Sequence, residues 1–141
     1  MKYTKATNYA LHTMVYLAAV PTGKVIGVRS LAELQSLSPT FLSKILTKLV
    51  KAGLIESAPG VNGGYKLSKS KYEISFLDII DAIEGAASLF SCTSEHQDCL
   101  IQGVMCDAEH ALEQYLKGRT IAELAERVGE QLTAFMKKET M

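Results

Sequence analysis

Residues 38–53, Ser-Pro-Thr-Phe-Leu-Ser-Lys-Ile-Leu-Thr-Lys-Leu-Val-Lys-Ala-Gly, decide the fold of this chain. Ser38 is a favoured helix N-cap, and Pro39 takes the first helical position, where a missing N–H costs nothing. Apolar residues recur at three- and four-residue spacing and predict one buried stripe, which consists of Leu42, Ile45, Leu46, Leu49 and Val50. The opposite face is polar, basic and free of acidic residues. Gly53 stands where the helix should end.

A shorter helix is predicted just before this segment. Ser30-Leu-Ala-Glu33 matches a capping box, in which the serine accepts from the N–H of Glu33 and the glutamate reaches back. The helix should therefore begin at Leu31 and run to about Gln35, with a turn at residues 36–37. Two helices joined in this way form a helix-turn-helix, which places its second helix in the major groove of DNA.

A β-hairpin is predicted directly after the second helix. Leu54-Ile55 and residues 65–67 are short extended runs on either side of residues 59–64, Pro-Gly-Val-Asn-Gly-Gly. The three glycines of this tip permit positive φ. The fold class expected is mainly α with a small β-wing: a winged helix-turn-helix DNA-binding domain at residues 1–85, a cysteine-containing sensor loop at 86–106, and C-terminal dimerisation helices at 107–141.

Further helices frame this motif. One is predicted over residues 8–19, one from the capping box Ser75–Asp78 to Gly85, one over residues 107–117, and one from a further box at Thr120–Glu123. The last of these carries Leu124, Val128, Leu132 and Phe135 on one face. Because symmetric dimers read two half-sites, the two terminal helices are expected to form a homodimer; the alternative is that they fold back on their own domain.

The charges of the two halves of the chain cancel. Residues 1–71 carry ten basic and two acidic side chains, whereas residues 72–141 carry five basic and thirteen acidic ones, so the net charge is zero. The basic half contains the helix-turn-helix, and lysines that neutralise phosphates supply most non-specific affinity for DNA. A solvated basic surface without a partner is the alternative interpretation of the charge alone.

Enzymatic and membrane functions are not indicated. The chain has no G-x-S-x-G, H-E-x-x-H, Walker or dinucleotide-binding motif, and its three histidines lack a companion nucleophile at suggestive spacing. The apolar run Met14–Val20 is far shorter than the roughly 20 residues that cross a bilayer. We expect a cytoplasmic protein that is not an enzyme.

Three cysteines lie within fifteen residues, at Cys92, Cys99 and Cys106. An odd number of cysteines in a cytosolic chain argues against structural disulfides. The C-x6-C-x6-C spacing is wider than zinc sites use, whereas iron–sulfur clusters accept looser spacing and need four ligands. His96, His110 or a neighbouring chain would supply the fourth ligand. Three interpretations stay open: ligands of an iron–sulfur cluster, a cluster-free thiol sensor, or buried structural thiols.

Most of the chain resembles one group of bacterial winged-helix regulators, the IscR/NsrR/CymR group. The resemblance rests on six segments: MKYTKATNYAL at residues 1–11, LAEL at 31–34, SPTFLSKIL at 38–46, LVKAGLIES at 49–57, GVNGGYKL at 60–67 and ISFLDIIDAIEG at 74–85. It implies a homodimeric repressor that binds a double-stranded DNA operator, with Thr40, Phe41 and Lys44 facing the major groove and the wing approaching the minor groove. Subgroups with three cysteines bind an iron–sulfur cluster and respond to iron–sulfur status, nitric oxide or redox state.

Two departures from the group bear on the site. Asn8 stands where some nitric-oxide sensors have an acidic iron ligand, and Pro59 stands where many relatives have a wing arginine. Asn62 and Lys66 are then the polar candidates of the wing. The helix after the sensor loop looks short for the group, which suggests that it starts near Cys99. The DNA-binding residues expected are Arg29, Thr40, Phe41, Lys44, Lys48, Asn62 and Lys66. For Phe41, the alternative is packing between helices. For the whole domain, a winged helix used only for contact with another protein is the less favoured function.

Overall fold

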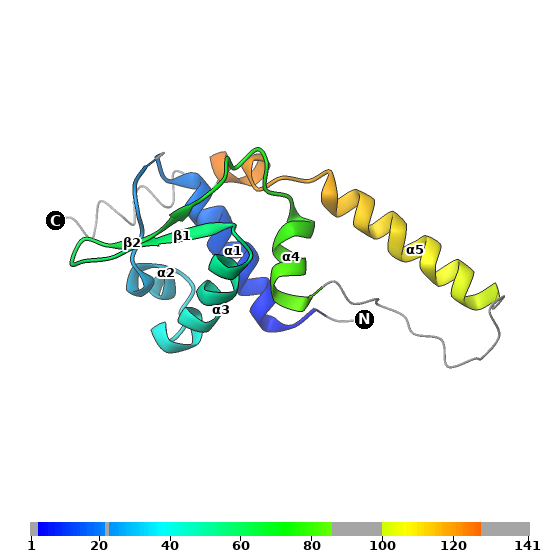
Figure 1. Cartoon of the computed structure of the whole chain (residues 1–141), viewed down its shortest axis with the longest axis horizontal. Helices are drawn as coiled ribbons and strands as arrows, with labels where there is room; N and C mark the ends of the chain where they lie inside the picture. The colour runs from blue at the N-terminus through cyan, green and yellow to red at the C-terminus, as the bar shows by residue number, and fades with distance from the viewer. Residues whose placement is uncertain (1–2, 22, 86–99, 128–141) are drawn as a thin grey trace.

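The computed structural model describes residues 3–21, 23–85 and 100–127, which form helices packed beside one small sheet (Figure 1). In chain order the elements are α1 (Lys5–Ala19), α2 (Val28–Leu34), α3 (Pro39–Lys51), β1 (Ile55–Ala58), β2 (Gly64–Leu67), α4 (Phe76–Glu84) and α5 (Leu100–Lys117). This order of three helices followed by a hairpin is that of a winged helix, and it confirms the predicted fold class.

A single core lies between α1, α2, α3, α4 and the sheet. Its largest fully buried side chains are Met14, Leu31, Leu42, Leu46, Leu49, Ile55, Ile74, Ile79 and Ile121. Burial of each large apolar side chain stabilises the fold by about 1.5–3 kcal/mol, so four buried residues of one stripe fix the rotation of α3. The predicted stripe is confirmed except at Val50, which is 38% exposed because it lies at the margin of the buried face.

The helix-turn-helix is present, with one of its two predicted caps. Ser38 caps α3, since its Oγ accepts from the backbone N–H of Phe41 at 3.1 Å. The capping box at Ser30 was wrong, because α2 begins at Val28 after an extended Gly27 and has no side-chain cap. The reason is a distant contact: Ile26 pairs with Tyr65 in the wing, which holds the chain extended up to Gly27.

The wing is an antiparallel hairpin in which Ile55 faces Leu67 and Ala58 faces Gly64. Three glycines of the tip permit positive φ, and the structure uses this freedom at one of them. Only Gly60 has positive φ, at 104°. A Cβ at Gly64 would collide with the carbonyl of Ile26 and the amide of Gly27, so this glycine allows a close backbone approach instead.

The capping box at the start of α4 is confirmed. Ser75 Oγ accepts from the N–H of Asp78 at 3.1 Å, and the Asp78 carboxylate accepts from the N–H of Ser75 at 3.0 Å. The helix ends at Gly85, whose φ is 81°. These two caps define both ends of the helix that leads out of the winged domain.

Helix α5 starts earlier than its predicted first residue and extends away from the domain (Figure 1). Residues 100–106, which the predicted boundaries assign to the sensor loop, are its first two turns, in agreement with the start suggested near Cys99. None of its side chains is buried. No helix among residues 3–21, 23–85 and 100–127 is long and apolar enough to cross a membrane.

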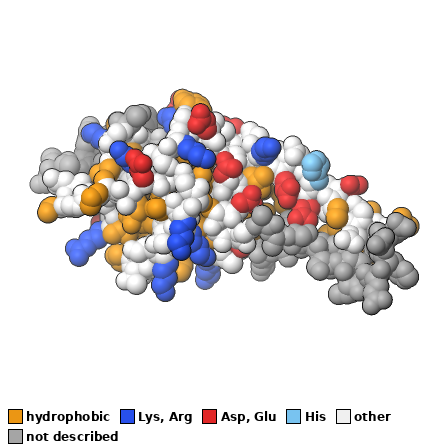
Figure 2. Space-filling model, viewed as in Figure 1, with side chains coloured by type: hydrophobic (Ala, Val, Ile, Leu, Met, Phe, Trp, Pro, Cys, Tyr) orange, Lys and Arg blue, Asp and Glu red, His pale blue; other side chains and the backbone are white. Residues whose placement is uncertain are grey.

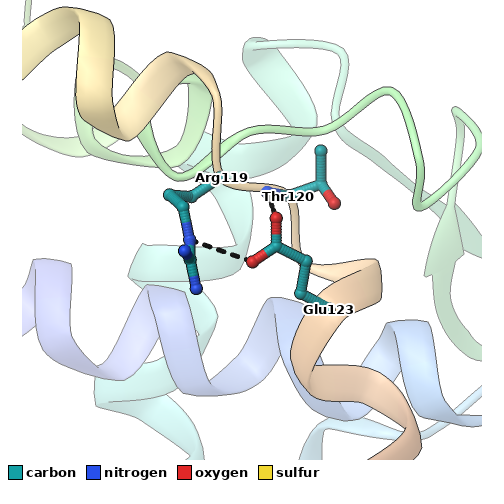
Figure 3. A network of polar contacts seen from close by, with 3 residues as sticks. All are labelled: Arg119, Thr120 and Glu123. Atoms are coloured by element: carbon teal, nitrogen blue, oxygen red, sulfur yellow. Dashed lines mark hydrogen bonds and ion pairs between the residues drawn. The ribbon is translucent and has the colours of Figure 1, made fainter.

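The segment after α5 returns to the winged domain. Its backbone pairs with residues 74–76, since Ile121 N–H donates to Ile74 at 3.1 Å and Phe76 N–H donates to Arg119 at 2.9 Å. The Glu123 carboxylate accepts from the N–H of Thr120 at 3.5 Å, which is the glutamate half of the predicted capping box. The same carboxylate forms an ion pair with Arg119 at 2.9 Å (Figure 3).

This returning segment corrects the expectation that the last helix packs only on a second copy. Ile121 and Ala125 are buried in the core of their own domain. The alternative of folding back thus holds for residues 121–125. The other apolar residues of that predicted helix, Val128, Leu132 and Phe135, lie outside the described residues.

Candidate nucleic-acid interface

The outer face of α3 presents its polar and basic side chains to solvent. Thr40, Lys44, Thr47 and Lys48 are all exposed. Thr47 Oγ1 donates to the carbonyl of Ser43 at 2.9 Å, and Ser43 Oγ donates to Pro39 at 2.8 Å. These two hydroxyls therefore bond along the helix itself, whereas the two lysines form no ion pair with any residue that the structure describes.

Phe41 packs between helices, which is one of the two interpretations that the sequence left open, and it is also partly exposed. Its ring packs edge-on against Tyr9 of α1, with ring centroids 5.9 Å apart and planes at 89°, yet 39% of the residue is exposed. An edge-to-face pair is a favourable aromatic geometry. The contact fixes the side chain at the start of α3 and leaves part of the ring available to a ligand.

The wing and the start of α2 lie next to each other. Arg29 and wing residues such as Pro59 and Gly60 line one open hollow of about 390 Å³. Two hydrogen bonds hold this arrangement: Ile26 N–H donates to Tyr65 at 3.0 Å, and Tyr65 N–H donates to Ile26 at 2.8 Å. The exposed Arg29 is thereby placed beside the wing.

The two predicted wing residues do not lie together. Asn62 is exposed in the tip, whereas the strand register puts Lys66 opposite Glu56, nearer the base of the hairpin. The Lys66 ammonium pairs with the Glu56 carboxylate at 3.4 Å, which offsets its charge. Sequence reasoning missed Val61, a fully exposed apolar residue at the tip. An apolar residue between turn residues was the available signal.

Charge is segregated over the surface. In Figure 2, Lys and Arg side chains gather along the lower edge, over α2 and α3, and Asp and Glu side chains lie mainly over α4 and α5. Burial, followed by the nearby carboxylates of Glu113 and Asp78, raises the pKa of Asp81. The basic edge is the one that carries α2 and α3, as the charge pattern of the sequence predicts for a DNA interface.

The Glu84 carboxylate, at the end of α4, forms hydrogen bonds with the start of α1, the helix against which Phe41 packs. Glu84 Oε1 accepts from Thr7 Oγ1 at 2.6 Å, from Thr4 N–H at 2.7 Å and from Thr4 Oγ1 at 2.9 Å. The hydrogen bond from Thr7, followed by that from the Thr4 backbone, holds the pKa of Glu84 below its usual value. Sequence reasoning missed this contact, which joins residues about 80 positions apart.

One of the three predicted thiol ligands lies within the described residues. Cys106 is an exposed free cysteine on α5, and His110 is exposed one turn further along the same helix. Residues at this spacing share a helix face. Cys92, Cys99 and His96 lie outside the described residues. Within the described ranges, no group of three His, Cys, Asp or Glu side chains is arranged to hold a metal ion.

A helix with an exposed face free of acids, a following wing and an exposed arginine beside that wing define a winged helix-turn-helix DNA-binding protein. A family model described as "Rrf2: Iron-dependent Transcriptional regulator" matches residues 3–127. The chain belongs to this family of transcriptional regulators, whose members are not enzymes.

Individual relatives agree with the family assignment. The chain is 31% identical over 131 residues to the HTH-type transcriptional regulator NsrR of Shouchella clausii, covering 88% of each protein. Its fold is similar to that of CymR, the global cysteine regulator of Bacillus subtilis, with a TM-score of 0.81, 26% identity and coverage of 90% of this chain and 98% of CymR. An oxidized form of Staphylococcus aureus CymR gives a TM-score of 0.76 at 33% identity, over 89% of this chain and 97% of that one.

Proposed function

We propose that this regulator is a repressor that reads a specific duplex operator through α3 and the wing. The observation that carries the proposal is the acid-free, solvent-exposed face of α3 next to the hairpin. Thirteen residues make a helix about 20 Å long, which fits along the major groove. The wing tip then approaches the neighbouring minor groove.

The side chains divide by the part of the duplex they reach. Thr40 and Phe41 stand in the first turn of α3, where recognition helices contact base edges. Lys44 and Lys48, one and two turns further on, reach phosphates or guanine, and Arg29 and Asn62 contact the backbone or minor groove beside the wing. Lys66 is left out of the contact set, because it is paired with Glu56 away from the tip.

A homodimer would present two recognition helices to two half-sites. Helix α5 supplies the surface for it, since it contributes no buried residue to its own domain. Its exposed large apolar side chains are Leu100, Ile101, Val104, Leu112 and Tyr115. Two copies of this helix packed together would bury these side chains, which isolated monomers leave in water.

The signal is proposed to enter through the cysteines. If Cys92, Cys99 and Cys106 hold an iron–sulfur cluster, the cluster supplies reactivity toward oxidants and nitric oxide; the alternative is a cluster-free thiol sensor of redox state. The exposure of Cys106 fits either chemistry. Because Cys106 is carried by α5, a change at its thiol acts on the helix proposed to join the two protomers.

The DNA proposal is tested with Lys44→Ala/Lys48→Ala. A duplex obtained by in vitro selection with the unaltered protein is titrated by fluorescence anisotropy at several salt concentrations. The plot of the logarithm of the association constant against the logarithm of salt concentration has a negative slope. The magnitude of this slope should decrease by about one unit for each lost phosphate contact. Lys117→Ala, at the far end of α5, is the matched control and should leave the slope unchanged. Equal slopes in all three proteins would remove α3 from the interface.

The cysteine proposal is tested with serine at each cysteine in turn. Anaerobically purified protein is measured for iron content, visible absorption and affinity for the selected duplex with and without oxidant. A three-thiolate cluster predicts loss of iron in every variant. A thiol sensor predicts a colourless protein whose oxidant response disappears in one variant only. If iron content, absorption and the oxidant response are unchanged in all three variants, the cysteines are structural.

A further inference from the structure

A basic hollow lies at the edge of the molecule opposite the recognition helix. It is formed by the end of α1, the loop after it, the end of β2 and residues 68–72, and its volume is about 350 Å³. In Figure 1 the loop after α1 and the segment after β2 lie along the upper edge, whereas α2 and α3 lie along the lower edge. The set of DNA contacts proposed above includes no residue of this hollow.

Four lysines line the hollow: Lys24, Lys66, Lys69 and Lys71. Lys66 has a carboxylate partner, Glu56, at 3.4 Å. The other three form no ion pair with any described residue. The C-terminal end of α1 contributes the equivalent of about half a negative charge, which is much less than three ammonium groups. The hollow therefore holds an excess of positive charge that α3 and the proposed duplex do not account for.

The wall also offers an apolar surface and a hydroxyl group. Leu17 and Leu67 line the hollow, as does Tyr72, which is 67% exposed. The Lys71 ammonium lies 5.6 Å from the centre of the Tyr72 ring. Ser70 Oγ accepts from the N–H of Tyr72 at 3.3 Å, and this arrangement leaves the hydroxyl hydrogen to be donated. Small-ligand sites typically have such apolar walls with a few polar groups, in volumes from about 300 Å³ upward.

We propose that this hollow binds a small organic anion in which a phosphate group adjoins a flat or apolar body. The lysines and Ser70 bind the phosphate, and Tyr72 with the leucines contacts the body. This site goes beyond the proposed function, since it would give the regulator a soluble ligand independent of the cysteines.

Occupancy of the hollow would act on the wing. Lys24 is two residues before Ile26, and Lys66 directly follows Tyr65; Ile26 and Tyr65 are the residues whose two hydrogen bonds attach the wing to the start of α2. An anion that draws Lys24 and Lys66 together holds these two segments in place. The bound ligand would therefore stabilise the wing in the position beside Arg29.

The test uses phenyl phosphate, inorganic phosphate and phenol with the full chain labelled with ¹⁵N. Phenyl phosphate should shift the amide signals of residues 68–72 saturably and bind about tenfold or more tightly than either half-molecule, because each half makes part of the contact. Lys69→Gln/Lys71→Gln should weaken this binding at least about tenfold. Lys5→Gln/Lys117→Gln removes the same charge elsewhere and should leave the binding unchanged.

Several results would overturn the site. Shifts spread over all lysines without saturation, equal binding by both double variants, or phosphate binding as tightly as phenyl phosphate would each contradict it. Affinity for the selected duplex separates this proposal from the proposed function: Lys69→Gln/Lys71→Gln should retain duplex binding within about twofold. Loss of duplex affinity in that variant, without phenyl phosphate binding to the unaltered chain, would make the hollow part of the DNA surface instead.

Discussion

Replacing Gly64 with alanine should detach the wing from the start of α2. A Cβ at this position meets the carbonyl of Ile26 and the amide of Gly27, which are backbone atoms that no side-chain rotation can move aside. The segment must shift, and the pair of hydrogen bonds between Ile26 and Tyr65, at 3.0 and 2.8 Å, is the contact that this shift breaks.

The magnitude follows from these two hydrogen bonds. Each contributes about 1 kcal/mol net, so their loss costs about 2 kcal/mol. Alanine also has less conformational freedom than glycine in the unfolded chain, and this effect stabilises the folded state by about 0.7 kcal/mol. The free energy of unfolding should fall by about 1.3 kcal/mol, equivalent to a Tm lower by about 4 °C for a chain of this size. Affinity for the selected duplex should fall as well, because the wing no longer lies beside Arg29.

Urea denaturation followed by circular dichroism, at one fixed protein concentration, measures this change. Gly103→Ala is the control substitution. Gly103 lies inside α5 with nothing within 4 Å of an added Cβ, so alanine there should stabilise the helix by up to about 1 kcal/mol. A Gly64→Ala protein as stable as the unaltered one, with unchanged duplex affinity, would refute the argument that the close approach positions the wing.

Three further outcomes are expected. Phe41→Ala should lose the edge-to-face contact with Tyr9, about 0.5–1.5 kcal/mol of stability, and should reduce affinity for the selected duplex more than for random DNA; equal losses on both would restrict Phe41 to packing. Glu84→Gln should be less stable than the unaltered protein at pH 7, because hydrogen bonds led by that of Thr7 lower the pKa of Glu84; the stability that this carboxylate adds is present above its ordinary pKa of 4.5 and is lost as the pH falls through its folded pKa, so the difference between the two urea curves should shrink progressively below pH 4.5, and a difference that does not change with pH would contradict the assignment. Val104→Glu, on the exposed face of α5, should yield monomers in sedimentation velocity, whereas an unchanged dimer would place the interface elsewhere.

Local sequence signals predicted those parts of the fold whose causes lie within a few residues. Ser38 with Pro39 defines the start of α3, and Gly53, with a φ of 78°, follows its end. The capping box at Ser75 lies within four residues and is present as predicted. Each of these features depends on a side chain and a backbone group of the same turn, so one sequence contains all the information needed.

The features that the sequence did not reveal depend on distant contacts. The start of α2 is set by Tyr65, almost forty residues away, and this contact overrode the capping box expected at Ser30. The Glu84 carboxylate bonds Thr7 across 77 positions. Ile121 and Ala125 complete a core whose other buried members, the last of which is Ile83, lie 38 or more residues earlier in the chain. The solvent-exposed face of α3 was predictable because helical periodicity alone separates its two faces.

The segregation of basic and acidic side chains has a consequence for how the protein meets DNA. A neutral molecule feels little net attraction at long range, but the field around a polyanion exerts a torque on a molecule with opposite charges at its two ends. Within about one Debye length, roughly 8–10 Å in physiological salt, this torque turns the α2–α3 edge toward the duplex and the α4–α5 region away from it. The orientation is thus selected before any base is contacted. Added salt screens this torque, so more of the encounters should occur with the wrong face of the protein toward the duplex. The rate of productive association should then fall.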